Sequence, residues 1–315
     1  MNRRSAVRNL AVVGAGSIFA RSLMGISQDE PENYTIRSEV RLVLLDVSVK
    51  DRGGGLVAGL SKDNFGVFEN GQPQRITVFD HDDLPVTVGV LVDESRSMTP
   101  KRADVLTAAE TFIEESNAHD EVFVLNFNDK VTPGLPGEML FSDNLQQLRS
   151  ALYRGVPQGK TALNDAVVAG LKQLELGRRD KKALVVISDG GDNASEHKRR
   201  EVLDRVERSI ATVYTIGLFE ADNPDRDPGI LRQLARISGG EVYFPEKPSD
   251  MVPVCRGIAK DIRTRYTVGY HPQERNGASS LRHISVRVSA PGHPRLITRT
   301  RSSYRYDEVE NPKKE

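Results

Sequence analysis

The chain has 315 residues, with 44 Lys and Arg against 44 Asp and Glu, and a single cysteine. A chain of this length can bury a sizeable core and is expected to hold two domains. The balanced charge excludes a global field that would attract nucleic acid or acidic membranes. One cysteine excludes an intramolecular disulfide.

Residues 1–27 are typical of an export signal. Arg3 and Arg4 give a charged start, residues 10–20 are apolar and small, and residues 25–27 (Gly-Ile-Ser) suit a signal peptidase. The apolar run is shorter than a membrane span requires, so no stable span is expected after cleavage. The paired arginines indicate twin-arginine export, with a Sec signal or an uncleaved anchor as the alternative. We therefore expect a periplasmic or extracellular protein.

Residues 34–83 are expected to form an N-terminal β segment. Strand-like patterns cover residues 40–49 and 75–79, and residues 65–68 lead into a Glu-Asn-Gly hairpin signal at 69–71. About fifty residues of this kind make a poor core alone. The segment therefore needs a partner.

Residues 84–263 alternate strand patterns with amphipathic helix patterns. Strands are predicted at 86–93, 121–127, 182–188, 211–217 and 241–244. Helices are predicted at 101–116, 144–153, 163–176, 196–209, 229–238 and 249–263. This alternation predicts an α/β domain with a doubly wound, mostly parallel sheet.

Residues 264–306 return to β patterns, with strand candidates at 265–271, 282–289 and 295–300. We predict that they pack with the N-terminal segment in one small β-sandwich, into which the α/β domain is inserted. The alternative is two separate β subdomains. Residues 307–315 are charged and are predicted to be a disordered tail.

The first strand of the α/β domain carries the candidate site. Residues 86–92 are apolar without alternation, which predicts a strand buried on both faces. Asp93 ends the run, Ser95 and Ser97 follow, and Thr99, before a proline, predicts a helix N-cap. The oxygen donors therefore lie at the carboxyl end of a buried strand, where open α/β sheets bind ligands.

Two later segments add donors of the same kind. Thr161 precedes a helix pattern in Gly-Lys-Thr-Ala-Leu-Asn-Asp-Ala, and Asp189 ends the apolar strand pattern 182–188. Carboxylates, hydroxyls and retained waters suit Mg²⁺, for which Mn²⁺ or Ca²⁺ can substitute. The alternative is that Asp93 and the serines only cap the next helix.

These motifs resemble those of a known family. Asp-x-Ser-x-Ser, a later Thr-Ala-Leu-x-Asp-Ala and a strand ending Ser-Asp-Gly resemble the metal-ion-dependent adhesion site (MIDAS) of von Willebrand factor A (VWA) domains, over residues 84–263. The flanking segments from residue 60 and at 266–270 resemble bacterial von Willebrand-related proteins first grouped in acidobacteria. The resemblance implies a metal site made of Asp93, Ser95, Ser97, Thr161 and Asp189.

The resemblance also implies a function. The three hydroxyls would bind the metal directly and the two aspartates through waters, leaving an open position for an acidic residue of a partner protein. The alternatives are a structural scaffold with a silent metal site and, least favoured, a metal-dependent hydrolase. Aspartyl-phosphate chemistry usually has a second acid where this chain has Ser95, and no serine lies in a Gly-x-Ser-x-Gly elbow. We therefore expect a binding module and not an enzyme.

Two residues depart from the family pattern. Arg96 stands between the serines where many members have glycine, and Glu94 replaces a small hydroxyl residue. Both are expected beside the open position. Arg96 could recruit an acidic rim on the partner, or Glu94 could pair with Arg96 and hold it aside.

Overall fold

The computed structural model describes residues 42–219, 226–273 and 281–305. The predicted export signal, residues 1–27, and the predicted tail, residues 307–315, lie outside these ranges. No helix among the described residues is both long enough and apolar enough to cross a membrane.

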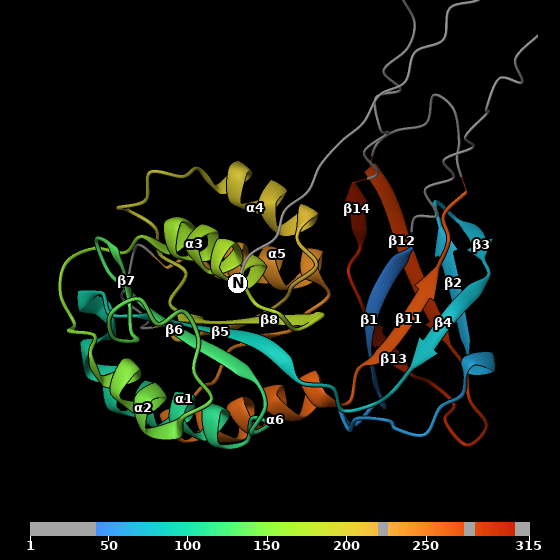
Figure 1. The fold of residues 1–315 in the computed structure, drawn as a ribbon, viewed down its shortest axis with the longest axis horizontal. Helices are drawn as coiled ribbons and strands as arrows, with labels where there is room; N and C mark the ends of the chain where they lie inside the picture. Colours follow the sequence, from blue (N-terminus) through green and yellow to red (C-terminus); the bar gives the residue numbers. More distant parts are fainter. Residues whose placement is uncertain (1–41, 220–225, 274–280, 306–315) are drawn as a thin grey trace, which may run out of the picture. The chain divides into compact units, whose positions relative to one another are not determined.

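A six-stranded sheet forms the centre of the α/β domain (Figure 1). Its order is β10 (Val242–Tyr243), β9 (Thr212–Gly217), β8 (Lys181–Ser188), β5 (Val86–Asp93), β6 (Glu121–Phe127) and β7 (Val131–Pro133). The first five are parallel, and β7 pairs antiparallel with β6 in a segment predicted as loop. The doubly wound, mostly parallel sheet is confirmed.

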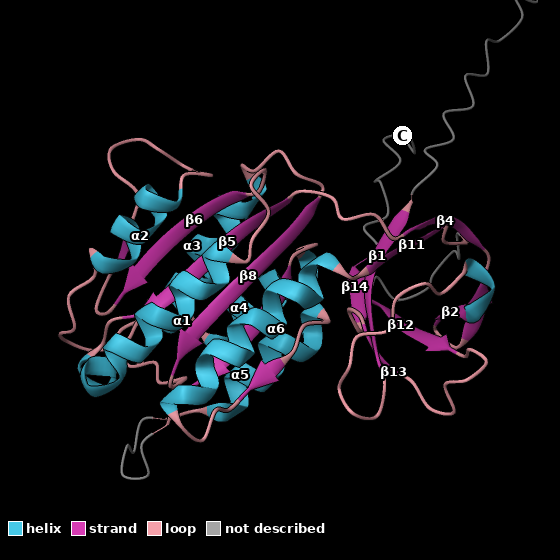
Figure 2. Cartoon of the chain, turned by 90° about the horizontal axis from the view of Figure 1, so that it is seen from below, coloured by secondary structure: helices cyan, strands magenta, loops and turns pink. Residues whose placement is uncertain are grey.

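Helices cover both faces of this sheet, as the strand–helix alternation requires. The helices are α1 (Arg102–Glu114), α2 (Leu145–Tyr153), α3 (Leu163–Glu175), α4 (Arg199–Arg208), α5 (Pro228–Ser238) and α6 (Met251–Arg263). Figure 1 shows α3, α4 and α5 on one face and α1, α2 and α6 on the other. Figure 2 shows α1 and α6 side by side across the second face.

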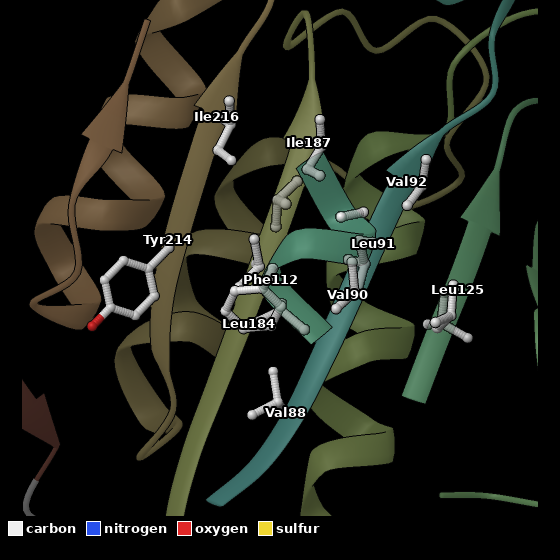
Figure 3. Close-up of a cluster of buried hydrophobic side chains, with 14 of the residues drawn as sticks. Val88, Val90, Leu91, Val92, Phe112, Leu125, Leu184, Ile187, Tyr214 and Ile216 are labelled. Atoms are coloured by element: carbon white, nitrogen blue, oxygen red, sulfur yellow. The ribbon is translucent and has the colours of Figure 1, made fainter. Parts of the chain in front are cut away.

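Strand β5 is buried along its whole length. All eight of its residues are buried, which confirms the prediction from its unbroken apolar run. Figure 3 shows its Val88, Val90 and Leu91 among apolar side chains of neighbouring elements. The packing leaves no room at Gly89, where an added Cβ would lie 2.3 Å from Cζ of Phe123. Close packing of this kind fixes the strand end that carries Asp93.

The two ends of the chain form one β-sandwich. One sheet has the order β13 (Ile297–Arg299), β1 (Val43–Lys50), β11 (Tyr266–Tyr270), β4 (Ile76–Asp80), and the other has β14 (Ser303–Arg305), β12 (Leu281–Val288), β2 (Phe65–Glu69), β3 (Gln72–Gln74). Each sheet therefore mixes N-terminal and C-terminal strands. Their buried residues make a single apolar cluster that includes Leu45, Val67, Val268 and Val286. The shared sandwich is confirmed, and the alternative of two separate subdomains is wrong.

The hairpin signal at residues 69–71 is also confirmed. Asn70 and Gly71 have positive φ values of 48° and 78°, and they join β2 to the short strand β3. Two successive positive φ values match the right-handed twist of the flanking strands, which is why Asn-Gly favours this turn. The sequence patterns had not indicated β3 or β14 as strands.

A buried polar network joins the end of α6 to β1. Asp261 accepts hydrogen bonds from Ser48 Oγ and from Tyr214 Oη, the latter at 2.6 Å. Arg265 Nη2 lies 3.2 Å from the same carboxylate and donates to a backbone carbonyl at 2.8 Å. Because a buried charge is costly without partners, these contacts let Asp261 and Arg265 remain ionised inside the protein.

Candidate metal centre

Three loops at one edge of the sheet carry the predicted donors. Asp93, Ser95 and Ser97 follow β5, Thr161 lies between α2 and α3, and Asp189 follows β8. Strands β5 and β8 are parallel neighbours, with Val92 opposite Ile187 at the last pair. Their carboxyl ends therefore meet at the same edge, where α/β sheets place ligands.

A chain of hydrogen bonds connects four of the five predicted donors. Asp93 Oδ1 accepts from the Ser95 N–H at 2.8 Å, and Ser97 Oγ donates to Asp189 Oδ2 at 2.7 Å. The hydroxyls of Ser95 and Ser97 lie 3.0 Å apart. Because Ser97 has one hydroxyl proton and gives it to Asp189, Ser95 is the donor of that pair. The four side chains thus form one continuous polar cluster.

The fifth predicted donor, Thr161, is held next to the loop after β8 by its backbone. Its N–H donates to Asn193 Oδ1 at 2.9 Å, and its carbonyl accepts from the N–H groups of Asn193 and Ala194 at 3.0 Å each. On the other side, the Arg96 N–H donates to the Gly159 carbonyl at 3.3 Å. The loop that carries Thr161 is therefore attached to both other loops.

The helix predicted at 101–116 is present as α1, and a 3-10 helix precedes it. A 3-10 helix spans Arg96–Lys101, and α1 starts at Arg102 without a side-chain cap. Thr99 Oγ1 donates to the Arg96 carbonyl at 2.8 Å within the 3-10 helix, so the predicted N-cap role of Thr99 is wrong. The hydroxyls of Ser95 and Ser97 do not cap α1 either, because they bond to one another and to Asp189.

The electrostatics of the cluster favour a cation. Asp93 and Asp189 are 2% and 1% exposed, so two carboxylates lie side by side out of water. Burial raises the pKa of Asp93 to about 7, partly offset by hydrogen bonds from Ser188 and Ser95. A bound cation would compensate for the lost hydration of both groups.

The donor chemistry also limits the kind of metal. Over the ranges that the structure describes, no group of three or more His, Cys, Asp or Glu side chains is placed to hold an ion. A metal here must therefore rely on serine and threonine oxygens beside the two carboxylates. Such an all-oxygen set fits a hard divalent cation better than a thiolate or imidazole metal.

The structure corrects the predicted surroundings of Glu94. Its carboxyl does not pair with Arg96; Arg102 Nε donates to Glu94 Oε2 at 3.0 Å, and Glu94 is 1% exposed. Burial raises the pKa of Glu94, and Arg102 opposes that rise. Arg102 Nη2 also donates to the Gly155 carbonyl at 2.6 Å. Glu94 is therefore a positioning residue between two loops, and it does not face an incoming ligand.

Two further residues of the centre were not singled out by the sequence. Ser188 Oγ donates to Asp93 Oδ2 at 2.6 Å, and Asn193 holds the backbone of Thr161. Ser188 immediately precedes Asp189, so the strand ending Ser-Asp-Gly contained a signal. That its hydroxyl would reach Asp93 depends on the pairing of β8 with β5.

Known proteins share this architecture. An uncharacterized protein from Synechocystis sp. is 24% identical over 183 residues, which is 57% of this chain and 42% of that protein. The chain thus spans less than half the length of that relative. A von Willebrand factor type A structure from Catenulispora acidiphila is 13% identical, with 86% of this chain and 74% of that chain covered and a TM-score of 0.50. BatB from Bacteroides thetaiotaomicron is 17% identical, with 56% and 98% covered and a TM-score of 0.45.

One further similar structure was solved with a metal. It is proximal thread matrix protein 1 from the mussel byssus with a zinc-occupied MIDAS motif, 16% identical, with 57% of this chain and 48% of that chain covered and a TM-score of 0.47. At 13% identity the Catenulispora acidiphila structure shows a shared fold and no more. The model of the von Willebrand factor type A domain matches residues 88–253, more than half of the chain. The chain therefore belongs to the von Willebrand factor type A domain family.

Proposed function

We propose that this protein is an exported, metal-dependent binding module whose cation engages an acidic residue of a partner protein. The metal ligands would be Asp93, Ser95, Ser97, Thr161 and Asp189. The observation that carries the proposal is the hydrogen-bonded chain of buried carboxylates and hydroxyls at the carboxyl edge of β5 and β8.

Each residue has a distinct role in this proposal. Ser95, Ser97 and Thr161 offer uncharged oxygens directly to the metal, while Asp93 and Asp189 act largely through waters. Ser188 fixes one oxygen of Asp93 and leaves the other directed at the Ser95 backbone. When bound, the cation would supply a coordination position for a partner's carboxylate. Mg²⁺ is the expected ion, with Mn²⁺ or Ca²⁺ as substitutes.

The hydrolase alternative lacks a base at the site. Ser97 donates its proton to Asp189, which is buried beside a second carboxylate. His197 Nδ1 lies 2.6 Å from Asp165 Oδ1, but among the described residues the Ser95 and Ser97 hydroxyls bond to one another and to Asp189 and not to this ring. A serine nucleophile needs a base that is itself available to take the proton. Catalysis would therefore require a general base in addition to the residues of the site, whereas the binding role does not.

A retention experiment tests the proposal against the scaffold alternative. The full chain is immobilised with Mg²⁺, and proteins retained from an extract of its own host are eluted with chelator. Thr161→Ala is the test variant, and Thr107→Ala, on the outer face of α1, is the matched control. We expect a partner that is released by chelator, lost with Thr161→Ala and kept with Thr107→Ala. Retention indifferent to chelator and to Thr161 would leave the metal site structural.

Export is a separate part of the proposal and rests on residues 1–27. The mature chain is expected to begin close to Gln28. Mass spectrometry of the protein from its host measures this directly. An intact N-terminus in a cytoplasmic fraction would contradict export without affecting the metal centre.

A further inference from the structure

One loop beside the candidate metal centre has a hydrogen-bonded backbone and solvent-exposed side chains. We call residues 153–160 the rim loop. The Gln158 N–H donates to the Glu94 carbonyl at 2.9 Å, and the Gly159 carbonyl accepts from the Arg96 N–H at 3.3 Å. Arg102 holds the Gly155 carbonyl at 2.6 Å. The rim loop is thus attached to the loop after β5 at two places and to the start of α1 at a third.

The exposed side chains of the rim loop follow a period of two. Arg154, Val156, Gln158 and Lys160 are exposed, whereas the intervening Gly155, Pro157 and Gly159 are partly buried. Two of the intervening residues are glycines, and Gly159 has a positive φ of 71°, so the chain turns between Gln158 and Lys160 while both side chains stay exposed. The loop therefore presents a row of cation, apolar group, amide and cation next to the metal centre.

The charge of this surface is positive. The side chains of Arg96, Arg154 and Lys160 form no ion pair with any residue that the structure describes. Asp129 is the acid beside them, and its Oδ1 accepts the Lys160 N–H at 3.2 Å. Glu94 adds no exposed negative charge, because it is buried against Arg102. On the rim loop and the loop after β5, three exposed cations therefore stand beside the exposed carboxylate of Asp129, while the loop after β8 adds the partly exposed Asp192.

The apolar component is Val156, whose side chain is 61% exposed, with Tyr153 at 52%. An exposed valine in a loop whose backbone is fixed gains free energy when a partner covers it. Because the backbone is already ordered, covering it costs little loop entropy. Val156 is therefore suited to recognise an apolar side chain that lies next to the metal-bound carboxylate.

We propose that the partner segment carries an apolar residue close to its metal-binding acid and further acids around it, and that Val156, Arg96 and Lys160 select it. This inference rests on the proposed function and names the partner's chemistry. An extended protein segment fits better than a phosphate-rich surface. A protein segment can offer an apolar side chain to Val156 as well as carboxylates to Arg96 and Lys160, whereas a phosphate-rich surface offers only the charges.

The test uses a phage-displayed random-peptide library on the immobilised full chain with Mg²⁺, eluted with chelator. We expect enrichment of sequences with an Asp or Glu and an apolar residue one or two positions away. The most enriched sequence is then synthesised, and its affinity is measured by fluorescence anisotropy. Val156→Ser should weaken binding about fivefold, the loss of one partly exposed apolar contact.

Matched variants separate the rim loop from general surface effects. Leu176→Ser is the control for Val156, because Leu176 is also 61% exposed but follows the far end of α3. Lys160→Gln should lower both affinity and its dependence on salt, whereas Lys172→Gln, exposed on α3, should change neither. Unchanged thermal unfolding shows that each variant is folded.

The outcomes distinguish this inference from the proposed function. Chelator-dependent enrichment of acidic peptides with no apolar preference, or equal binding by Val156→Ser, would overturn the role of the rim loop and keep the metal function. No chelator-dependent enrichment would overturn both. Displacement of the enriched peptide by anionic phospholipid vesicles, with unchanged binding to neutral ones, would replace a protein segment by a lipid headgroup and so overturn the inference.

Discussion

Arg102 Nε lies 3.0 Å from Glu94 Oε2, and the same guanidinium donates to the Gly155 carbonyl at 2.6 Å. Through this arrangement the first helix of the α/β domain holds together the loop with Asp93 and the loop with Thr161. Space is tight there, since a Cβ added at Gly155 would lie 2.4 Å from Glu94 Oε1. The relationship explains why glutamate is accommodated at a position next to the metal centre.

The two partners of this pair should differ in their effect on stability. The Glu94 side chain is 2% exposed and that of Arg102 is 25% exposed. Arg102→Met leaves a buried carboxylate without its partner and should cost about 3–5 kcal/mol. Glu94→Gln removes one charge-assisted hydrogen bond and should cost about 1–3 kcal/mol. Urea unfolding of both variants and of the double variant measures this, and strictly additive losses would contradict the coupling.

Metal affinity should depend on Ser188 as well as on the predicted ligands. Isothermal calorimetry should show about one Mg²⁺ or Mn²⁺ per chain, weakened about 10–100-fold by Asp93→Ala or Asp189→Ala. Ser188→Ala should weaken it about 10-fold, because Asp93 loses the hydroxyl that orients it. Ser150→Ala, whose hydroxyl bonds within α2, is the control. Unchanged binding in all three site variants would dismiss the metal centre.

Metal binding should also release a proton near neutral pH. Burial raises the pKa of Asp93 to about 7, so below that pH the metal-free carboxyl is protonated and the cation must displace the proton. The affinity therefore rises with pH up to about 7 and levels off above it. We expect about tenfold weaker Mg²⁺ binding at pH 6 than at pH 8. Calorimetry in buffers of different ionisation enthalpy measures the proton, and equal affinity at both values would contradict the shift.

The network around Asp261 should contribute stability that acid removes. Burial raises the pKa of Asp261, but Arg265 and the bonds from Ser48 and Tyr214 outweigh it and leave the pKa below its usual value. A lowered pKa means that this stability is present above the unfolded pKa, about 3.9, and is lost as pH falls through the folded value. Asp261→Asn should cost about 3–5 kcal/mol at neutral pH, because Arg265 is 3% exposed and loses its counter-ion.

A surface pair provides the control for Asp261. Asp204 and Arg208 pair on α4 with side chains 39% and 49% exposed. Asp204→Asn should therefore change the free energy of unfolding by about 0–1 kcal/mol. Chemical unfolding at pH 7 and at pH 3 separates the two variants. If both variants lost the same ~0–1 kcal/mol of unfolding free energy, the buried network would contribute no more stability than a surface ion pair.

The shared sandwich predicts that the two ends of the chain depend on each other. Strand β11 lies between β1 and β4 and pairs with both. Removing residues 264–305 leaves these strands unpaired and exposes Leu45, Val47 and Ile76. We expect the truncated chain to aggregate, while residues 84–263 alone stay soluble. A soluble, cooperatively unfolding chain without residues 264–305 would contradict this, as measured by light scattering and circular dichroism.

The sequence by itself determined the helices and the longer strands and their order, though not the short strands β3, β7 and β14, because periodicity is a local property that a three-residue strand cannot display. An unbroken apolar run marks β5 as a buried central strand, and strand–helix alternation implies a parallel sheet. The β patterns at both ends, each too short for a core, indicated the sandwich. The family motif named five candidate donors, and the structure places them on three loops at one edge of the sheet.

Only the tertiary structure decided which side chains meet. Ser188 and Asp93 are 95 positions apart, and Ser48 and Asp261 are 213 apart. Arg102, and not Arg96, pairs with Glu94: a 3-10 helix spans Arg96–Lys101, and Arg102 at the start of α1 contacts the buried carboxylate. Side-chain directions at strand ends and helix starts depend on neighbouring elements, which no local pattern encodes. For that reason the sequence predicted the candidate donors but not the residues that hold them in place.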